Sequence, residues 1–245
     1  MIKILRSIFL WAVMMLIIIV YGHMIIPLQA LFSKDKKKTY HGGGVVWSKI
    51  LLFLAGIDVK VDGIENIPKD KAVIFMPNHQ GHWDYPILFN SLPRRFAFVA
   101  KKELFSVPFL GKYMENAGNI PIDRQAGRSA HESLLKVTNA IKEGDSILIF
   151  PEGTRTWDGK VGEFKRGSFH VAFETGAPIV PVAISGSYKI MKRHSWVVNP
   201  GKIELKIGKP ISLQVSGKHV TKEDYVIAME MVKNSIVEML GAAGA

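Results

Sequence analysis

The alternation of apolar and polar positions divides the 245-residue chain into two parts. Residues from Ile8 to Ile26 are almost wholly apolar, and a second apolar run extends from Val45 to Ala55. From Asp58 onward, short β-rich runs alternate with helical patterns, which favours a sheet with helices on its faces. The sequence therefore predicts an α/β fold with a mixed, largely parallel sheet in residues 57–245. A hydrophobic two-helix membrane anchor, residues 1–56, is expected to precede this domain, which should fold without it.

The individual elements of the α/β part follow from period-2 and period-3.6 patterns. Strands are expected at Val59–Val61, Ala72–Met76, Phe96–Ala100, Asn119–Ile122, Ser146–Phe150, Ile179–Ser185 and Lys202–Ile207. Helices are expected at about Tyr85–Ser91, Phe109–Asn116, Ser129–Glu143, Ser168–Thr175 and Lys222–Leu240. Thr221 and Asp224 have the spacing of a capping box at the start of the last helix.

The first apolar run is just long enough to cross a bilayer, whose core of ~30 Å requires about 20 residues of helix. Pro27 is expected to end this helix. Ser33–His41 and Gly42-Gly43-Gly44 are expected to form a link to the second run, which is too short to span alone. Either the first helix spans and the second lies at the interface, or both form a hairpin within one leaflet. We favour the hairpin because the second run is short and interfacial in composition.

Composition narrows the classes of partner. Hydrophobic residues make up 48% of the chain and charged residues 22%, which indicates a globular rather than a disordered protein. The net charge of +11 implies attraction to an anionic partner, but the chain lacks the basic run with interleaved aromatics that is typical of nucleic-acid modules. The apolar N-terminus favours a membrane surface. The absence of cysteine excludes disulfides, thiolate metal sites and a cysteine nucleophile.

A first candidate site directly follows a predicted strand, where α/β folds place their functional groups. Residues Asn78–Asp84 read NHQGHWD. On a continuous helix His79 and Asp84 would lie about 140° apart, but Gly81 disfavours a helix and Asp84 is expected to be the N-cap of the next one. A tight loop could then fold His79 onto the Asp84 carboxylate, leaving the other ring nitrogen to take a proton from a substrate hydroxyl. Alternatively, His79 and His82 are polar loop residues and Asp84 only caps a helix.

A second candidate site also follows a predicted strand. Residues Phe150–Arg155 read FPEGTR, and their proline and glycine predict a tight turn that presents Glu152 and Arg155 from a fixed backbone. An arginine fork binds phosphate oxygens bidentately, as a phosphorylated substrate would require. The alternative is a surface turn with a salt bridge.

Together, the His-x4-Asp loop and the downstream FPEGTR segment resemble the glycerolipid acyltransferase family. Within it, the chain is most similar to bacterial 1-acylglycerol-3-phosphate acyltransferases. Two further blocks match in order, Gly118–Arg124 (GNIPIDR) and Val180–Ile184 (VPVAI). The resemblance covers roughly Val59 to Ile211.

The resemblance implies a role for each matched residue. His79 would be the general base and Asp84 its orienting partner, whereas His82 lies in the variable part of the motif and receives no catalytic role. Direct attack of the acceptor hydroxyl on the thioester is expected, because the chain has neither a cysteine nor a Gly-x-Ser-x-Gly elbow. The substrate-binding residues implied are Glu152, Gly153, Arg155, Arg124 and Lys101. Lys102 is adjacent to Lys101, and either lysine could face the site.

The implied activity is transfer of a fatty acyl group from acyl-CoA or acyl carrier protein to the sn-2 hydroxyl of 1-acylglycerol-3-phosphate, giving phosphatidic acid in phospholipid biosynthesis. The expected partners are lysophosphatidic acid, the acyl thioester donor and membrane lipid, with no nucleic acid, metal or other cofactor. The expected location is the cell inner membrane, with the catalytic domain on the cytoplasmic side. Alternatives are another glycerolipid or lysolipid acceptor, a membrane-bound metallohydrolase that uses His79, His82 and Asp84, or a non-enzymatic basic membrane module.

Overall fold

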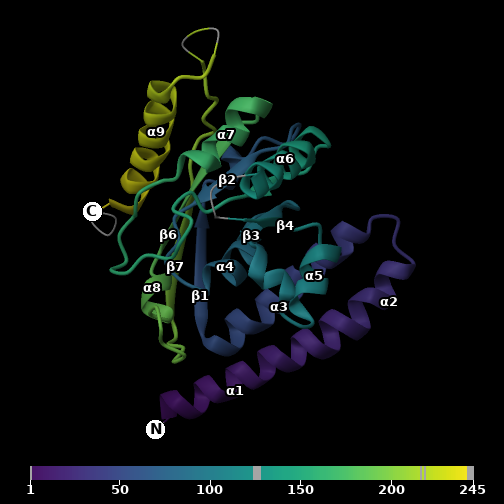
Figure 1. The fold of residues 1–245 in the computed structure, drawn as a ribbon. Coiled ribbons are helices and arrows are strands. Elements are labelled where there is room, and N and C mark those ends of the chain that lie inside the picture. The colour runs from purple at the N-terminus through teal and green to yellow at the C-terminus, as the bar shows by residue number, and fades with distance from the viewer. Residues whose placement is uncertain (1, 124–127, 216, 218, 242–245) are drawn as a thin grey trace.

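The computed structural model describes residues 2–123, 128–215, 217 and 219–241, in which seven strands form one sheet with helices on both faces (Figure 1). The strands are β1 (Ile57–Asp62), β2 (Ile74–Pro77), β3 (Ala97–Lys101), β4 (Ile120–Ile122), β5 (Ile147–Leu148), β6 (Ile179–Ser185) and β7 (Gly201–Ile207). The helices that follow β1 are α4 (Asp84–Ser91), α5 (Leu110–Asn116), α6 (Arg128–Lys142), α7 (Arg166–Thr175), α8 (Ser187–Ile190) and α9 (Lys222–Leu240). The predicted mixed, largely parallel sheet is confirmed, and Thr221 and Asp224 form the predicted capping box.

The strand order is β1-β7-β6-β2-β5-β3-β4. The neighbouring pairs from β6 to β4 are all parallel, whereas β7 is antiparallel to β6 and parallel to β1. The central strands β6, β2, β5 and β3 therefore end at the same edge of the sheet. In parallel sheets this carboxyl edge is where functional loops meet.

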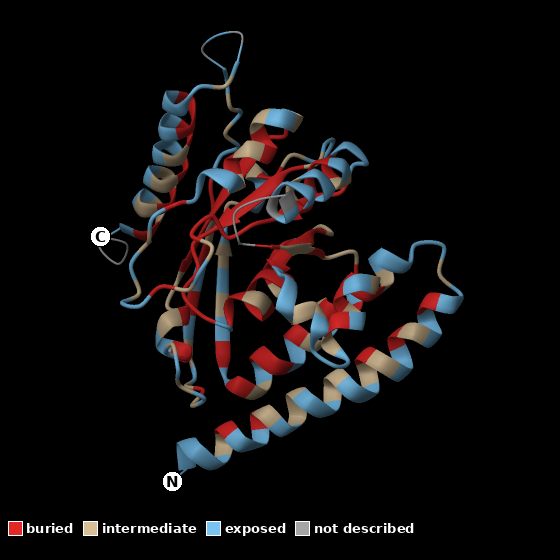
Figure 2. Cartoon of the chain, in the orientation of Figure 1, coloured by how far each residue is buried: buried red, intermediate tan, exposed pale blue. Residues whose placement is uncertain are grey.

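Successive side chains of the central strands belong to two separate cores, one on each face of the sheet. Figure 2 shows that the central strands consist mainly of buried residues. In β2, Phe75 faces the core that includes residues of α4 and α8, and Ile74 and Met76 face the core that includes residues of α6, α7 and α9. All three side chains are 0% exposed. Strands buried on both faces explain why these segments read as continuous apolar runs in the sequence.

The N-terminal helix does not end at Pro27 as predicted. Helix α1 (Ile2–Leu16), a π-helical stretch (Ile17–Ile25) and α2 (Ile26–Leu31) form one continuous helix. Proline is tolerated there because it occupies the first turn of α2, directly after the wider π-helical turns, where a missing backbone N–H costs little. This helix is long and apolar enough to cross a membrane by length and composition.

The predicted glycine link is also wrong, because Gly43 and Gly44 lie inside helix α3 (Lys36–Ala55). A Cβ atom on Gly43 would lie 2.1 Å from Ile26 Cδ1, and one on Gly44 would lie 2.8 Å from the ring of Phe89. The glycines therefore let α3 pack closely against the N-terminal helix on one side and α4 on the other. The two N-terminal helices form an antiparallel hairpin that lies along the α/β part (Figure 1).

Helix α3 is part of the core rather than a detachable anchor. Leu51, Leu52 and Ala55 are 2%, 4% and 0% exposed and belong to the same apolar cluster as Phe75. Burial of an aliphatic side chain the size of leucine contributes about 1.5–3 kcal/mol. The domain boundary near residue 56 stays a prediction, but this packing opposes the expectation that the α/β part folds well without residues 1–56.

Candidate active site

The carboxyl edge of the four central strands brings together segments that are far apart in the sequence. The loop after β2 contains residues 78–83, the segment after β5 contains the FPEGTR turn, and β6 is followed by Ser187. Lys101 ends β3. Because β2 pairs with both β5 and β6, the two sequence motifs become neighbours.

The tight loop predicted between His79 and Asp84 is confirmed. His79 Nδ1 lies 2.7 Å from Asp84 Oδ2, and the same oxygen accepts the backbone N–H groups of Gln80 and Gly81 at 2.7 and 2.9 Å. Asp84 is not the N-cap of α4, however. It is the first residue of the helix, Trp83 is the N-cap, and the carboxylate turns back to the loop amides instead. The same carboxylate thus closes the loop and orients the imidazole.

The pair is buried and fixed from several sides. His79 is 7% exposed and Asp84 is 0% exposed. The His79 ring stacks on Phe150 with a centroid distance of 3.9 Å, and the hydroxyl of Ser187 donates to Asp84 Oδ1. Since a carboxylate only accepts, His79 Nδ1 carries the hydrogen, and Nε2 is left as a proton acceptor. His79 is also one of the residues that line a cavity.

Glu152 holds the His79 loop in place. Its Oε1 accepts the backbone N–H of His79 at 2.8 Å and its Oε2 accepts that of Gly162 at 3.0 Å, with the side chain nearly fully buried. Burial raises the pKa of Glu152 to about 7, against the opposing effect of the two amide hydrogen bonds. Both oxygens are occupied by the backbone, which favours a positioning role for Glu152 over direct contact with an acceptor.

We expect Glu152→Gln to weaken this support, because the new amide group would place an N–H against one of the two backbone N–H groups. Leaving a buried donor unsatisfied costs about 1–3 kcal/mol. Folding raises the pKa of Glu152 from 4.5 to about 7. The contribution of this carboxyl group to the free energy of unfolding of the wild type therefore decreases as pH rises from 4.5 to 7. The difference in unfolding free energy between wild type and Glu152→Gln should therefore shrink from pH 4.5 to 7. Denaturant titrations at several pH values measure it, and a difference that grows with pH would contradict the raised pKa.

The other predicted binding residues are only partly brought together. Gly153 has φ of 67°, the left-handed conformation that favours glycine, so it permits the turn. Arg155 lines the cavity, and burial together with the charge of Arg193 lowers its pKa. Lys101 also lines the cavity and pairs with Glu103 at 3.3 Å. Arg124 lies outside the described residues.

The structure also distinguishes the two adjacent lysines. Lys102 forms an ion pair with Asp123, whereas Lys101 is the one that lines the cavity. Of the two, Lys101 is therefore placed to reach a bound substrate.

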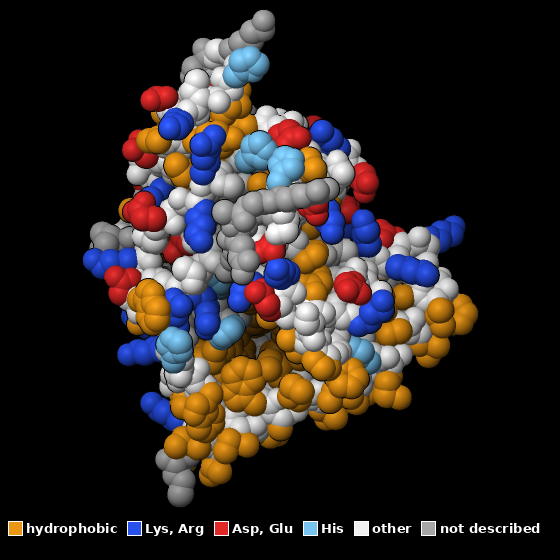
Figure 3. Space-filling view, viewed as in Figure 1, with side chains coloured by type: hydrophobic (Ala, Val, Ile, Leu, Met, Phe, Trp, Pro, Cys, Tyr) orange, Lys and Arg blue, Asp and Glu red, His pale blue; other side chains and the backbone are white. Residues whose placement is uncertain are grey.

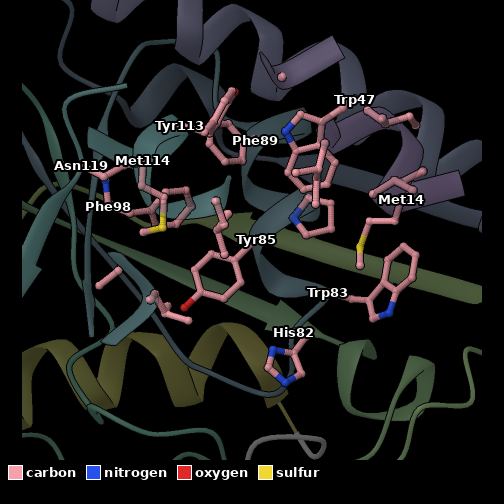
Figure 4. A pocket seen from close by; sticks show the side chains of 18 of the residues that line it. Met14, Trp47, His82, Trp83, Tyr85, Phe89, Phe98, Tyr113, Met114 and Asn119 are labelled. Atoms are coloured by element: carbon pink, nitrogen blue, oxygen red, sulfur yellow. The ribbon is translucent and has the colours of Figure 1, made fainter. Parts of the chain in front are cut away.

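The cavity has a volume of about 700 Å³ and is mainly apolar. This volume is within the usual range for small-molecule sites. Its walls come from the N-terminal helix, α3, α4 and α5, and Met14, Trp47, Phe89 and Tyr113 can be seen around it in Figure 4. His79 and Arg155 also line this cavity and contribute polar groups to its lining. The site can thus hold a long apolar chain beside a proton acceptor and a positive charge.

His82 also faces the cavity (Figure 4). Burial against the wall and the nearby charge of Arg155 lower its pKa to about 4, so this imidazole is neutral at pH 7. Among the described residues, no group of three or more His, Cys, Asp or Glu side chains could hold a metal ion. Of these two histidines, His79 is the one whose ring contacts the Asp84 carboxylate.

The sequence did not indicate the roles of three residues that support the site. Asn78 bonds both the N–H and the C=O of Ile184 in β6, at 2.7 and 3.0 Å. The Ser187 hydroxyl donates its single hydrogen to Asp84 and lies 3.3 Å from Gln80 Oε1. Asn78 and Gln80 lie in the NHQGHWD segment and so were visible as polar residues, but their partners lie more than 100 positions away. No local pattern indicated Ser187.

An α/β fold with a carboxylate-oriented histidine at the edge of a parallel sheet, opening on an apolar cavity, defines a site for base catalysis on an amphiphilic substrate. Comparison with known proteins identifies the family within this class. The family model described as Acyltransferase matches residues 58–185, more than half of the chain, and the chain belongs to this acyltransferase family. The family resemblance of the sequence motifs is thereby confirmed.

Individual relatives carry more specific names. The chain is 33% identical over 202 residues to the chloroplastic 1-acyl-sn-glycerol-3-phosphate acyltransferase BAT2 of Brassica napus, covering 82% of this chain and 57% of that protein. It is 41% identical over 136 residues to the 1-acyl-sn-glycerol-3-phosphate acyltransferase of Borreliella burgdorferi, covering 56% and 54%. The chain thus spans a little over half the length of these curated relatives.

A solved structure agrees over nearly the whole chain. The 1-acyl-sn-glycerophosphate acyltransferase PlsC from Thermotoga maritima superimposes with a TM-score of 0.80 at 29% identity, covering 98% of this chain and 97% of that one. The likeness therefore includes the N-terminal helices as well as the α/β part.

Proposed function

We propose that this protein transfers a fatty acyl group from an acyl thioester to the sn-2 hydroxyl of 1-acylglycerol-3-phosphate, forming phosphatidic acid. The observation that carries the proposal is the His79–Asp84 pair, 2.7 Å apart, on the wall of a mainly apolar cavity. Family membership supports acyl transfer, and the names of the relatives support this acceptor.

The geometry supports a direct transfer. His79 Nε2 takes the proton of the acceptor hydroxyl as its oxygen forms a bond to the thioester carbonyl carbon. The carboxylate of Asp84 stabilises the imidazolium that results. When the carbon–sulfur bond breaks, the imidazolium returns the proton to the leaving thiolate. The base is thus regenerated, and no acyl group needs to reside on the protein.

The available side chains also favour the direct route. The chain has no cysteine. Ser187 contacts the Asp84 carboxylate. It is 0% exposed, and its hydroxyl already donates to that carboxylate. Ser187 is not among the described residues that line the cavity, so it is poorly placed to be acylated.

The cavity accounts for the amphiphilic character of the substrates. Its apolar walls can cover a fatty acyl chain, and Arg155 and Lys101 supply positive charge where the chain would meet polar groups. Arg155 would bind the acceptor phosphate through charge-assisted hydrogen bonds. We propose acyl-CoA or acyl carrier protein as the donor, with no cofactor besides this thioester co-substrate.

An assay of the purified full-length protein in detergent tests this function. Lysophosphatidic acid, glycerol-3-phosphate and other lysolipids are each offered as acceptor, with acyl-CoA and with acyl carrier protein as donor. We expect phosphatidic acid from lysophosphatidic acid with at least one donor. If neither donor acylates lysophosphatidic acid, or if an acceptor without phosphate is preferred, the proposed acceptor is wrong.

We further propose that the N-terminal hairpin lies in one leaflet of the inner membrane, with the α/β part on the cytoplasmic side. Polar contacts attach the first helix to the α/β part at both ends. Arg6 donates to Val198 O at 2.6 Å, and the His23 ring bonds Phe109 O at 2.7 Å. These contacts favour a helix that lies along the domain over one that crosses the bilayer away from it.

The outer face of the hairpin is apolar and suits the lipid side of such an arrangement. Apolar side chains cover the lower surface in Figure 3. In the N-terminal segment, Leu16, Met24, Phe32 and Phe53 are 61%, 66%, 86% and 83% exposed. An apolar surface of this kind is typical of membrane-embedded faces. Acceptor and product could then stay in the bilayer while the headgroup reaches His79.

Cysteine labelling distinguishes the hairpin from a spanning helix, since the chain has no native cysteine. Single cysteines are placed at Lys3, near the start of the first helix, and at Lys38, near the start of α3, and one at Lys192 marks the α/β part. A membrane-impermeant maleimide is added to sealed vesicles from either side. We expect all three positions to react from the same side. Reaction of Lys3→Cys from the opposite side alone would establish a spanning helix.

A further inference from the structure

A second arginine, Arg193, contacts the backbone of Arg155. Arg193 lies in the segment between α8 and β7, and its Nη1 donates to the backbone carbonyl of Arg155 at 2.7 Å. The Arg193 guanidinium carbon lies 3.5 Å from the ring centroid of Trp157. This stacking fixes the plane of the guanidinium and joins the segment after β6 to the turn after β5.

In the described part of the chain, neither Arg155 nor Arg193 forms an ion pair. Arg193 Nε is buried and, among the described residues, has no hydrogen-bond partner. Burial and then the charge of Arg193 lower the pKa of Arg155, whereas the charge of Asp84 acts in the opposite direction. Two adjacent, partly exposed guanidinium groups with spare N–H donors are stabilised when an anion binds between them.

We propose that Arg155 and Arg193 together bind one phosphate monoester of a substrate at the edge of the cavity. A phosphate monoester carries close to two negative charges at neutral pH and offers three oxygens to the two planar forks. Trp157 holds Arg193 in position. In Figure 3, Lys and Arg side chains border the hollow above the apolar surface. The inference rests on the proposed function and adds Arg193 and Trp157 to its site.

Two substrates of the proposed reaction carry such a group. One is the acceptor, through its sn-3 phosphate, and the other is an acyl-CoA donor, through the phosphate on its ribose. The chemistry is the same, so the assay must separate them.

The test measures KM and kcat for Arg193→Ala and Arg193→Lys in the full-length protein, with Lys192→Ala as the matched control. Lys192 is exposed and adjacent, so its removal takes one positive charge from the same segment without touching Arg155. We expect Arg193→Ala to raise the KM of the phosphate-bearing substrate at least about tenfold, with a smaller change in kcat. Arg193→Lys should restore it only in part, because lysine lacks the planar fork.

The substrates are varied to locate the phosphate. If the acceptor phosphate binds here, the KM for lysophosphatidic acid rises with every donor, and monoacylglycerol shows no such penalty. If the donor phosphate binds here, the KM rises for acyl-CoA but not for acyl-dephospho-CoA. The inference is overturned if Arg193→Ala matches Lys192→Ala, or if its loss is equal with substrates that carry no phosphate monoester.

Failure of the proposed function can be recognised separately. If the wild-type protein transfers no acyl group, thermal unfolding with and without glycerol-3-phosphate still tests the anion site. Stabilisation of the wild type that is lost in Arg193→Ala would support the arginine pair. Equal shifts in unfolding temperature for the two proteins across the titration would overturn it.

Discussion

Replacing His79 with alanine is expected to lower kcat by about 10²–10⁴-fold, the usual contribution of a general base, while the protein stays folded. The fold should survive because the side chain makes a single hydrogen bond, to Asp84. Without it, Asp84 still accepts from Gln80, Gly81 and Ser187. The backbone N–H of His79 also keeps its bond to Glu152. Steady-state rates with lysophosphatidic acid, together with a denaturant titration, measure both parts of this expectation.

The matched control is His82→Ala, since His82 is the other histidine that lines the cavity. It makes no contact with Asp84 of the kind that orients His79, so its removal should affect kcat far less. The assignment fails if His79→Ala keeps most of its activity, or if His82→Ala is the more damaging change. The effects of His79→Ala and Asp84→Ala should also be strongly non-additive, because a base and its orienting group act as a unit.

The part of the site that could be predicted from sequence is its local part. His79 and Asp84 are five residues apart, and Gly81 between them made a turn the simplest interpretation. The strands and long helices were also visible, because burial on one or both faces imposes a periodic pattern. Placing both motifs directly after strands indicated one edge of the sheet, although the order of the strands depends on long-range pairing that no local pattern reveals.

The incorrect predictions also arise from contacts that a local sequence pattern does not reveal. Gly43 and Gly44 were expected to form part of a link, since glycine disfavours helix, yet both lie inside α3, where they allow close packing against Ile26 and Phe89. Asp84 was interpreted as a helix cap from its position alone, but the nearby loop amides compete for the same carboxylate. Ser187 and Arg193 could not be connected to the site, since their partners lie 103 and 38 residues away in the sequence.

Asp84 offers a sharper test than its alanine variant, because asparagine can keep every hydrogen bond around it. The amide oxygen can take the place of Oδ2 and accept from His79, Gln80 and Gly81. The amide nitrogen can then donate to Ser187, whose hydroxyl is free to turn toward Gln80 Oε1, 3.3 Å away. The loop amides therefore keep their acceptor in Asp84→Asn, which loses the negative charge and adds one further amide N–H that needs an acceptor.

We expect Asp84→Asn to lose less stability than Asp84→Ala but to lose about 10²–10⁴-fold in kcat. Without the carboxylate, the imidazolium formed during proton transfer is no longer stabilised and the ring can adopt the wrong tautomer. Asp84→Ala should differ, since it leaves the buried N–H groups of Gln80 and Gly81 without their acceptor, at about 1–3 kcal/mol each. Near wild-type turnover in Asp84→Asn would show that the carboxylate only closes the loop, whereas low turnover in a protein that stays folded assigns its charge to catalysis.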